Sequence, residues 1–264
     1  MSNLSLNLKA HQTGERQKEM KAVWIFTLAT LILSVGILFL LPGVSGPSLI
    51  VFIPTILAVV LIRYTFGKGQ IRPRLFSRQQ WAISLKWLAI SLGLALLLRL
   101  GVSLLGVLLV PDYNFNPGPF SPFLIMVFLF AAGEEIGWRG FALPVMLANG
   151  YRPLTSALVL GIPWALLHLP LVLPSMLSEG TPMAAQFVIL LALSVLTAWL
   201  YLSGGGSLTA AVLLHGGQNI TVILNNGLDA ASSGWLMAAV YGIVAIIVII
   251  LTRGRLGVPA ADNK

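Results

Sequence analysis

Eight runs of apolar residues, each about as long as a helix that crosses a bilayer, divide this chain of 264 residues. About 20 apolar residues span the hydrocarbon core, and a helix satisfies its own backbone hydrogen bonds there. The sequence therefore predicts an all-α, polytopic membrane protein with about eight transmembrane helices. The expected spans are 23–41, 48–66, 87–110, 122–148, 153–173, 183–202, 208–224 and 234–252.

Composition points to the same class of protein. Hydrophobic residues make up 57% of the chain and charged residues 9%, a profile typical of multi-pass membrane proteins rather than soluble domains. The absence of cysteine excludes disulfides, thiolate metal ligands and a cysteine nucleophile. The net charge of +8 would suggest a nucleic-acid partner in a soluble protein, but topology explains it here, and no nucleic-acid partner is expected.

The basic residues predict how the spans are oriented. Nearly all lysines and arginines precede the first span, follow the last, or lie between spans 2 and 3 or between spans 4 and 5. Cytoplasmic loops of membrane proteins carry an excess of Lys and Arg, so these segments and both termini are expected in the cytoplasm, and the protein in the cell (inner) membrane. The expected outer loops, which contain neither residue type, are 42–47, 111–121, 174–182 and 225–233.

Two adjacent glutamates lie inside the fourth span. Glu134 and Glu135 occur in an apolar run from Pro122, where an ionised carboxylate is costly and marks a candidate functional site. Arg139 is one helical turn after Glu135, which predicts an ion pair between them. Glu134 would then point about 100° away and face another group.

Two of the three histidines also lie in apolar spans. His168 follows Trp164 by one turn in span 5, where Pro163 and Pro170 are expected to interrupt the helix. In span 7, His215 and Asn219 are likewise one turn apart. Two imidazoles, two carboxylates and an amide on spans 4, 5 and 7 predict either a metal site or a site that activates water.

These motifs resemble a known family. Glu134-Glu135-x-x-x-Arg139, then Trp164-x-x-x-His168, then His215-x-x-x-Asn219 are similar in order and spacing to the three motifs of the CPBP intramembrane proteases. This family includes the type II CAAX prenyl endopeptidases and bacteriocin-processing or immunity proteins. The second motif more often has Phe where this chain has Trp164.

The resemblance implies hydrolysis of a peptide bond at or within the membrane, on a peptide or protein substrate that includes the CAAX tripeptide of prenylated proteins in one branch. By position, Glu134 would activate the water, Glu135 with Arg139 would orient the site, His168 and His215 would polarise the water, and Asn219 would stabilise the oxyanion. The same resemblance leaves two mechanisms open. In the first mechanism, Glu134, His168 and His215 are the candidate ligands of a Zn²⁺ ion. In the second, the same side chains act as acids and bases without a metal.

The resemblance also suggests how the chain divides. The expected parts are a cytoplasmic tail (1–22), spans 1–3 with their basic loop (23–119), a catalytic core (120–225), a final span (226–252) and a second cytoplasmic tail (253–264).

Two rival functions fit the sequence. One is a catalytically silent bacteriocin-immunity or membrane partner protein of the same fold, and the other is a transporter coupled to protons or cations. Arg99 is a further charge within span 3, and we expect either a structural role or a contact with Glu134, Glu135 or a substrate carboxylate.

Overall fold

In the computed structural model, residues 3–40 and 50–259 are described, and they form helices and connecting segments without any strand. The all-α, polytopic prediction is confirmed. The helices that coincide with the predicted spans are α1 (Asn3–Leu40), α3 (Ile53–Thr65), α6 (Leu85–Leu109), α7 (Met126–Gly137) with α8 (Leu143–Ala148), α9 (Pro153–Ser178), α10 (Met183–Ser203), α11 (Leu208–Ile220) and α12 (Ala230–Thr252).

Five helical segments of the described chain are long and apolar enough to cross a membrane on their own, namely Thr13–Ile37, Leu85–Leu109, Pro153–Pro170, Met183–Ser203 and Ala230–Thr252. The remaining helices of the bundle, α3, α7 with α8, and α11, are shorter or broken. Two of these shorter elements carry residues of the candidate site: α7 carries the two glutamates and α11 carries His215. The longer helices around them bury these residues. The count of eight spans stays a prediction.

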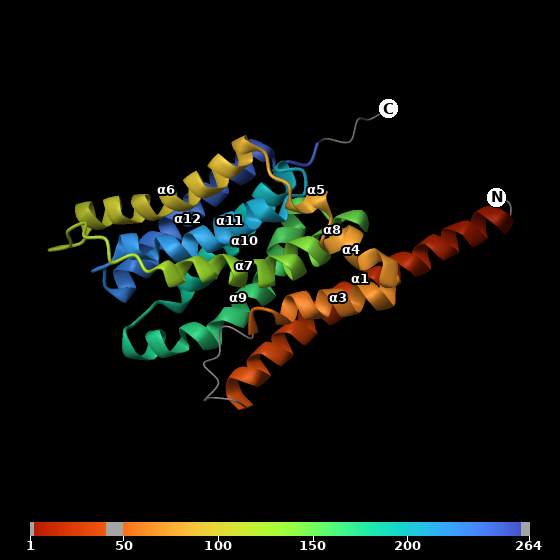
Figure 1. The fold of residues 1–264 in the computed structure, drawn as a ribbon, viewed down its shortest axis with the longest axis horizontal. Coiled ribbons are helices and arrows are strands. Elements are labelled where there is room, and N and C mark those ends of the chain that lie inside the picture. Colours follow the sequence, from red (N-terminus) through yellow and green to blue (C-terminus); the bar gives the residue numbers. More distant parts are fainter. Residues whose placement is uncertain (1–2, 41–49, 260–264) are drawn as a thin grey trace.

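The helices form one bundle whose two ends differ in charge. In Figure 1, α6, α12, α10, α11 and α7 run across the molecule in similar directions, and α1 extends beyond them at its N-terminal end. The basic connection between α3 and α6 folds into the short helices η1 (Lys68–Gln70), α4 (Ile71–Leu75) and α5 (Arg78–Trp81) at one end of the bundle (Figure 1). Segments 111–121, 179–182 and 226–229 gather at the opposite end. The predicted loop at 42–47 lies outside the described residues.

Glycines allow the central helices to approach closely. A Cβ added at Gly137 of α7 would lie 2.6 Å from Pro54 Cβ of α3, and one added at Gly217 of α11 would lie 2.7 Å from Ala95 Cβ of α6. Gly216 lies in the same way against Phe128 of α7. Small residues let transmembrane helix backbones come together, and α11 consequently lies against α6, α7 and α10.

The predicted fourth span is not one regular helix. It consists of a 3₁₀ turn η2 (Pro122–Ile125), α7, a π-helical turn η3 (Trp138–Ala142) and α8. Pro144 in the first turn of α8 has no N–H to donate to the preceding turn, which accounts for a local change of helical register. π turns of this kind occur often at functional sites, and this one carries Arg139.

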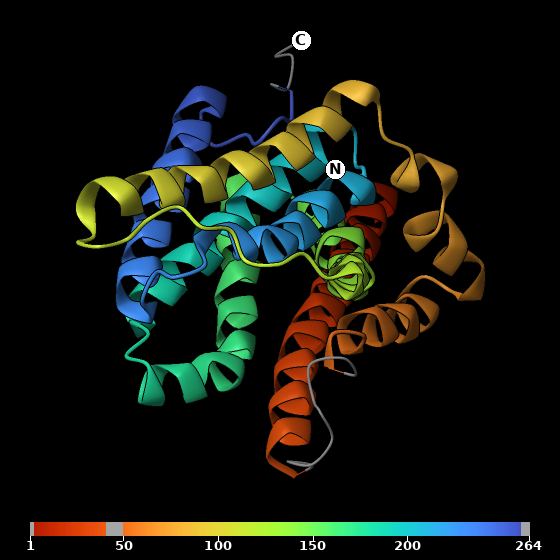
Figure 2. The same cartoon turned by 60° about the vertical axis from the view of Figure 1, so that its left-hand side comes forward.

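The expected interruption of span 5 was wrong. α9 continues from Pro153 to Ser178 with Pro163, Pro170 and Pro174 inside it. Proline removes one backbone hydrogen bond and tilts the following turn, and neighbouring helices in a membrane protein tolerate the resulting kink. Figure 2 shows that α9 bends in its C-terminal third, where Pro170 and Pro174 lie.

Candidate active site

The centre of the site is an ion pair between α7 and η3. Glu135 is fully buried, and its Oε1 accepts a hydrogen bond from Arg139 Nη1 at 3.1 Å, as the spacing of the two residues predicted. The same oxygen lies 2.9 Å from His215 Nδ1 of α11. One carboxylate oxygen therefore joins a cation from its own segment to an imidazole from another helix.

The second oxygen of this carboxylate is available. Glu135 Oε2 is buried and has no hydrogen-bond partner among the described residues. A buried carboxylate oxygen without a donor is costly, so Glu135 Oε2 is a candidate acceptor for a hydrogen bond from a reactant.

Trp164 connects the other members of the site. Its Nε1 donates a hydrogen bond of 2.6 Å to Glu134 Oε2, so the second glutamate does face another group, the indole of α9. The rings of His168 and His215 lie edge-on to the indole, with centroids 4.8 Å and 5.4 Å from it. The Arg139 guanidinium lies 5.2 Å from the same ring. Trp164 thus contacts four of the six predicted site residues.

Both histidines are oriented through Nδ1, which leaves Nε2 for chemistry. His168 Nδ1 lies 2.7 Å from the carbonyl oxygen of Trp164, one turn earlier in α9. A carbonyl only accepts hydrogen bonds, so Nδ1 carries the hydrogen and Nε2 of the neutral ring is an acceptor. His215 Nδ1 is held by the Glu135 carboxylate in the same way. A carboxylate that fixes a histidine tautomer is a common feature of catalytic and metal sites.

Asn219 is not joined to this group. It lies one turn after His215 on α11, but its side chain is exposed and makes no hydrogen bond to the described part of the protein. The structure therefore brings Glu134, Glu135, Arg139, His168 and His215 together, and places Asn219 next to them along α11 without a contact.

Residues of α10 that the sequence analysis did not select also belong to the site. Arg139 Nη2 donates to Ser194 Oγ at 3.2 Å and to Thr197 Oγ1. Ser194 and Thr197 are three residues apart in an otherwise apolar helix, so they share one face. Two polar residues on one face of an apolar span could have predicted a polar contact there. Their contact with Arg139 adds α10 to the three spans that were expected to form the site.

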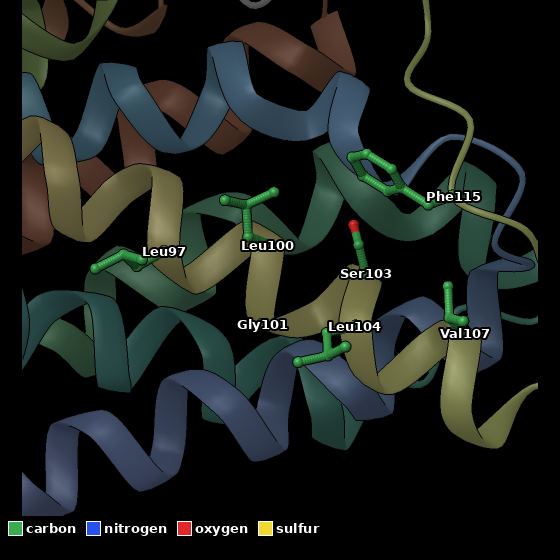
Figure 3. Close-up of a pocket in the computed structure, with 7 residues that line it drawn as sticks. All are labelled: Leu97, Leu100, Gly101, Ser103, Leu104, Val107 and Phe115. Carbon is green, nitrogen blue, oxygen red and sulfur yellow. The ribbon is translucent and has the colours of Figure 1, made fainter.

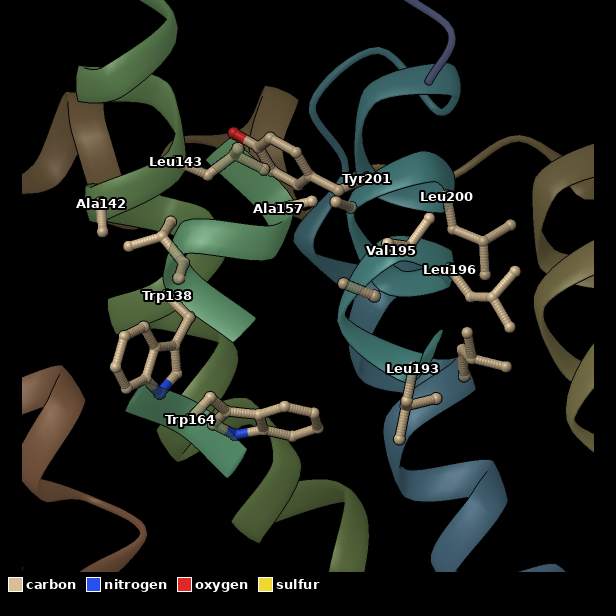
Figure 4. Close-up of a cluster of buried hydrophobic side chains, with 14 of the residues drawn as sticks. Trp138, Ala142, Leu143, Ala157, Trp164, Leu193, Val195, Leu196, Leu200 and Tyr201 are labelled. Atoms are coloured by element: carbon tan, nitrogen blue, oxygen red, sulfur yellow. The ribbon is translucent and has the colours of Figure 1, made fainter. Parts of the chain in front are cut away.

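The surroundings of the site are buried and closely packed. Figure 4 shows buried side chains around it: Trp138 and Trp164 lie near one another in the view, and Tyr201 of α10 reaches toward Leu143 of α8. Gly161 of α9 lies so close to α10 that an added Cβ would be 2.9 Å from Ser194 Oγ. This packing fixes α9 against α10 and so holds Trp164 near Arg139.

The side chains do not form a ready metal site. Among the described residues, no group of three or more His, Cys, Asp or Glu side chains is arranged to hold a metal ion. The expected ligands for Zn²⁺ were Glu134, His168 and His215. The Nδ1 hydrogen bonds leave Nε2 of both histidines and one oxygen of Glu134 unengaged, but these three side chains are not grouped around one point as the ligands of a single ion would be.

Comparison with known proteins identifies this part of the chain. Residues 116–221, which contain all six predicted site residues, match the model of the Rce1-like, type II CAAX prenyl endopeptidase family. This part of the chain is therefore similar to the CAAX proteases. The resemblance seen in the three motifs is therefore confirmed, and the family is one of membrane proteases.

A relative shows similarity to the same kind of protein over a longer stretch. The CAAX prenyl protease 2 of Methanococcus maripaludis is 26% identical to this chain over 197 residues, which cover 67% of this chain and 69% of the archaeal protein. The similarity thus extends beyond the 106 residues of the family match.

Proposed function

We propose that this protein is an active intramembrane endopeptidase that hydrolyses a peptide bond near the membrane surface, with the C-terminal CAAX tripeptide of a prenylated protein as its candidate substrate. One observation carries the proposal: the buried Glu135 carboxylate orients His215, while Glu134 lies on the other side of the same tryptophan, beside His168. The family match and the name of the archaeal relative support the substrate class.

In the proposed mechanism, Glu134 takes a proton from a water molecule as that water attacks the scissile carbonyl carbon. The Nε2 atoms of His168 and His215 bind and polarise the water, and a proton passes to the leaving amine as the C–N bond breaks. Arg139 and Glu135 keep His215 in position. Asn219, exposed on α11 one turn from His215, is the proposed donor to the oxyanion.

The decisive test compares the wild type with Glu134→Gln in detergent. Quenched peptides, including a prenylated CAAX peptide, serve as substrates, and Glu15→Gln on the exposed face of α1 is the matched control. We expect Glu134→Gln to reduce turnover by at least about a hundredfold, the usual contribution of a general base, with unchanged thermal unfolding. Turnover by folded Glu134→Gln equal to that of the wild type would rule out this mechanism.

Metal content measured on the same samples separates the two mechanisms. Stoichiometric metal that is lost together with activity on chelation would show that the side chains rearrange into a ligand set. Activity that survives chelation supports the acid–base mechanism built from the glutamates and histidines alone. Binding of a partner protein without cleavage of any peptide would instead favour the silent, immunity-type function.

We further propose the topology indicated by the basic residues, with both termini in the cytoplasm of a cell whose inner membrane holds the protein. The basic helices α4 and α5 would then lie at the cytoplasmic surface. Cysteines introduced singly at Ser77, between α4 and α5, and at Asn116, in the segment after α6, test this by labelling with a membrane-impermeant reagent in intact cells; these two segments lie at opposite ends of the bundle (Figure 1). We expect labelling at position 116 and none at position 77.

A further inference from the structure

Arg99 is a buried guanidinium to which the structure gives no carboxylate. Its side chain is 7% exposed, and Nη1 and Nη2 donate to Asn225 Oδ1 at 3.1 Å and to the Gln218 carbonyl at 3.2 Å. Within the described part of the chain, its Nε has no hydrogen-bond partner, and the ion pairs found there all involve Glu135. The expected contact with Glu134 or Glu135 was wrong. A buried charge that has only neutral partners remains uncompensated.

This guanidinium lines a cavity of about 460 Å³ at the end of the bundle where the segments without Lys or Arg gather. We name this cavity the polar pocket; its walls include Arg99, Gly118, Glu179, Asn225 and Ser233. Arg99 and Asn225 are buried, whereas Glu179 is exposed. The polar pocket therefore offers one buried cation and one exposed carboxylate, which fits a ligand that carries both charges.

A second cavity of about 480 Å³ runs along the same part of α6. Figure 3 shows this apolar groove, with side chains from α6 and Phe115 from the following segment around it. Its lining is Leu97, Leu100, Ser103, Leu104, Val107 and Phe115, together with a glycine. Most of these apolar side chains are exposed, so they suit the hydrocarbon chain of a lipid.

Two connections link the apolar groove to the polar pocket. Ser103 lines the groove, and its Oγ accepts a hydrogen bond of 2.8 Å from Asn225 Nδ2, which belongs to the pocket. The segment after α6 borders both, through Phe115 on the groove and Gly118 on the pocket. The two cavities thus flank one stretch of α6 and present an apolar and a charged surface to the same molecule.

We propose that the polar pocket and the apolar groove together bind one zwitterionic phospholipid of the surrounding bilayer. Its phosphate pairs with Arg99, the ammonium of an ethanolamine headgroup pairs with Glu179, and one acyl chain lies in the groove along α6. A cavity of this size suits a headgroup. A purely anionic headgroup would satisfy Arg99 but meet repulsion from Glu179, and the carboxylate of a peptide without a lipid chain would leave the groove empty.

This site is separate from the proposed peptidase chemistry, because none of the six site residues lines either cavity. Its test therefore needs no turnover. Detergent-purified protein is incubated with vesicles containing equal amounts of phosphatidylethanolamine and phosphatidylglycerol, and the lipid that stays bound is weighed and identified by native mass spectrometry. The expected result for the wild type is one phosphatidylethanolamine per chain.

Variants locate the lipid. Glu179→Gln is expected to lower the ratio of bound phosphatidylethanolamine to phosphatidylglycerol roughly threefold, since an exposed ion pair is weak. Leu104→Trp fills the groove and lowers retention of both lipids without changing their ratio. Arg99→Gln lowers total retention about tenfold, the loss expected for hydrogen bonds to a charged group. Glu15→Gln, the same charge change on exposed α1, is the matched control and leaves retention unchanged.

Two outcomes overturn the proposal. One is equal retention of the two lipids by the wild type with no response to Glu179→Gln or Leu104→Trp; these two exposed positions decide the matter if Arg99→Gln does not fold. The other is a wild type that retains no lipid but binds a short peptide through its free C-terminal carboxylate, with Arg99→Gln losing that binding. The polar pocket would then belong to a peptide terminus.

Discussion

The two buried arginines of this protein are accommodated in different ways. Arg139 is 3% exposed and pairs with the carboxylate of Glu135, with hydroxyls of α10 around it. Arg99 is 7% exposed and is held by an amide oxygen, a backbone carbonyl and the sulfur of Met237. The positive charge of Arg139 is neutralised by a carboxylate. Arg99 has hydrogen-bond partners, but all of them are neutral, so its charge is not neutralised.

The difference indicates what each region can do. Around Arg139, ionisable groups keep unused atoms, such as Glu135 Oε2 and the Nε2 atoms of the two histidines, and such groups exchange protons. Around Arg99, the partners are neutral and titrate nowhere near physiological pH. These partners can tie helices together and leave the cation free to attract an anion, but none of them acts as an acid or a base.

The largest expected effect is on the region of Arg139. Glu135→Ala leaves the guanidinium buried without its carboxylate, and we expect the free energy of unfolding to fall by about 3–5 kcal/mol, with turnover lost. The measurement is denaturant unfolding in detergent. Arg139→Met combined with Glu135→Ala removes the orphaned charge, so the double variant should recover part of the loss. Equal instability of the single and double variants would mean that the charge is not the cause.

Arg99 should give a smaller loss of stability. Arg99→Leu removes an uncompensated charge, and the remaining cost is that of leaving the Gln218 carbonyl and Asn225 Oδ1 without a donor, about 1–3 kcal/mol. Unfolding in the same detergent checks this, and turnover per folded molecule should stay close to that of the wild type. A loss of stability as large as that of Glu135→Ala would show that the two arginines do not differ in how their charges are compensated.

Local patterns in the sequence predicted the ion pair and the helices, because both follow from spacing along one segment. The i to i+4 relation of Glu135 and Arg139 is independent of what surrounds the helix. Hydropathy likewise predicted eight apolar spans, and each of them coincides with at least one helix. The π turn at Trp138–Ala142 and the unbroken α9 were not predicted, since proline has several structural solutions and the packing of neighbours selects one.

Contacts between helices were predictable only in part. The three motifs indicated that spans 4, 5 and 7 meet, but the hydrogen bond from Trp164 to Glu134 depends on the rotation of α9 about its axis. The support of Arg139 by Ser194 and Thr197 depends on α10 lying beside η3. Arg99 shows the same limit, because its neutral partners lie more than 100 residues away in the chain.

Trp164 offers a sharper test of the site, because the chain contains a matched control. Trp164→Phe keeps the ring between the two histidines and removes only the donor to Glu134, so we expect turnover to fall about tenfold, the equivalent of one hydrogen bond to a charged group. Trp138 is equally buried, but its Nε1 has no hydrogen-bond partner among the described residues. Trp138→Phe should leave turnover nearly unchanged, and equal losses in both variants would reduce the role of Trp164 to packing.

The smallest expected effect tests the support of Arg139 by α10. Thr197 Oγ1 accepts from Arg139 Nη2 and bonds the Leu193 carbonyl of its own helix, so Thr197→Val should cost about 1 kcal/mol of unfolding free energy. Thr27 of α1 is buried too, but its hydroxyl bonds only the Val23 carbonyl one turn earlier. Thr27→Val is therefore the control with the same change of shape. If it destabilises the protein as much as Thr197→Val, the intrahelical bond accounts for the loss, and Arg139 depends on Glu135 and Ser194 alone.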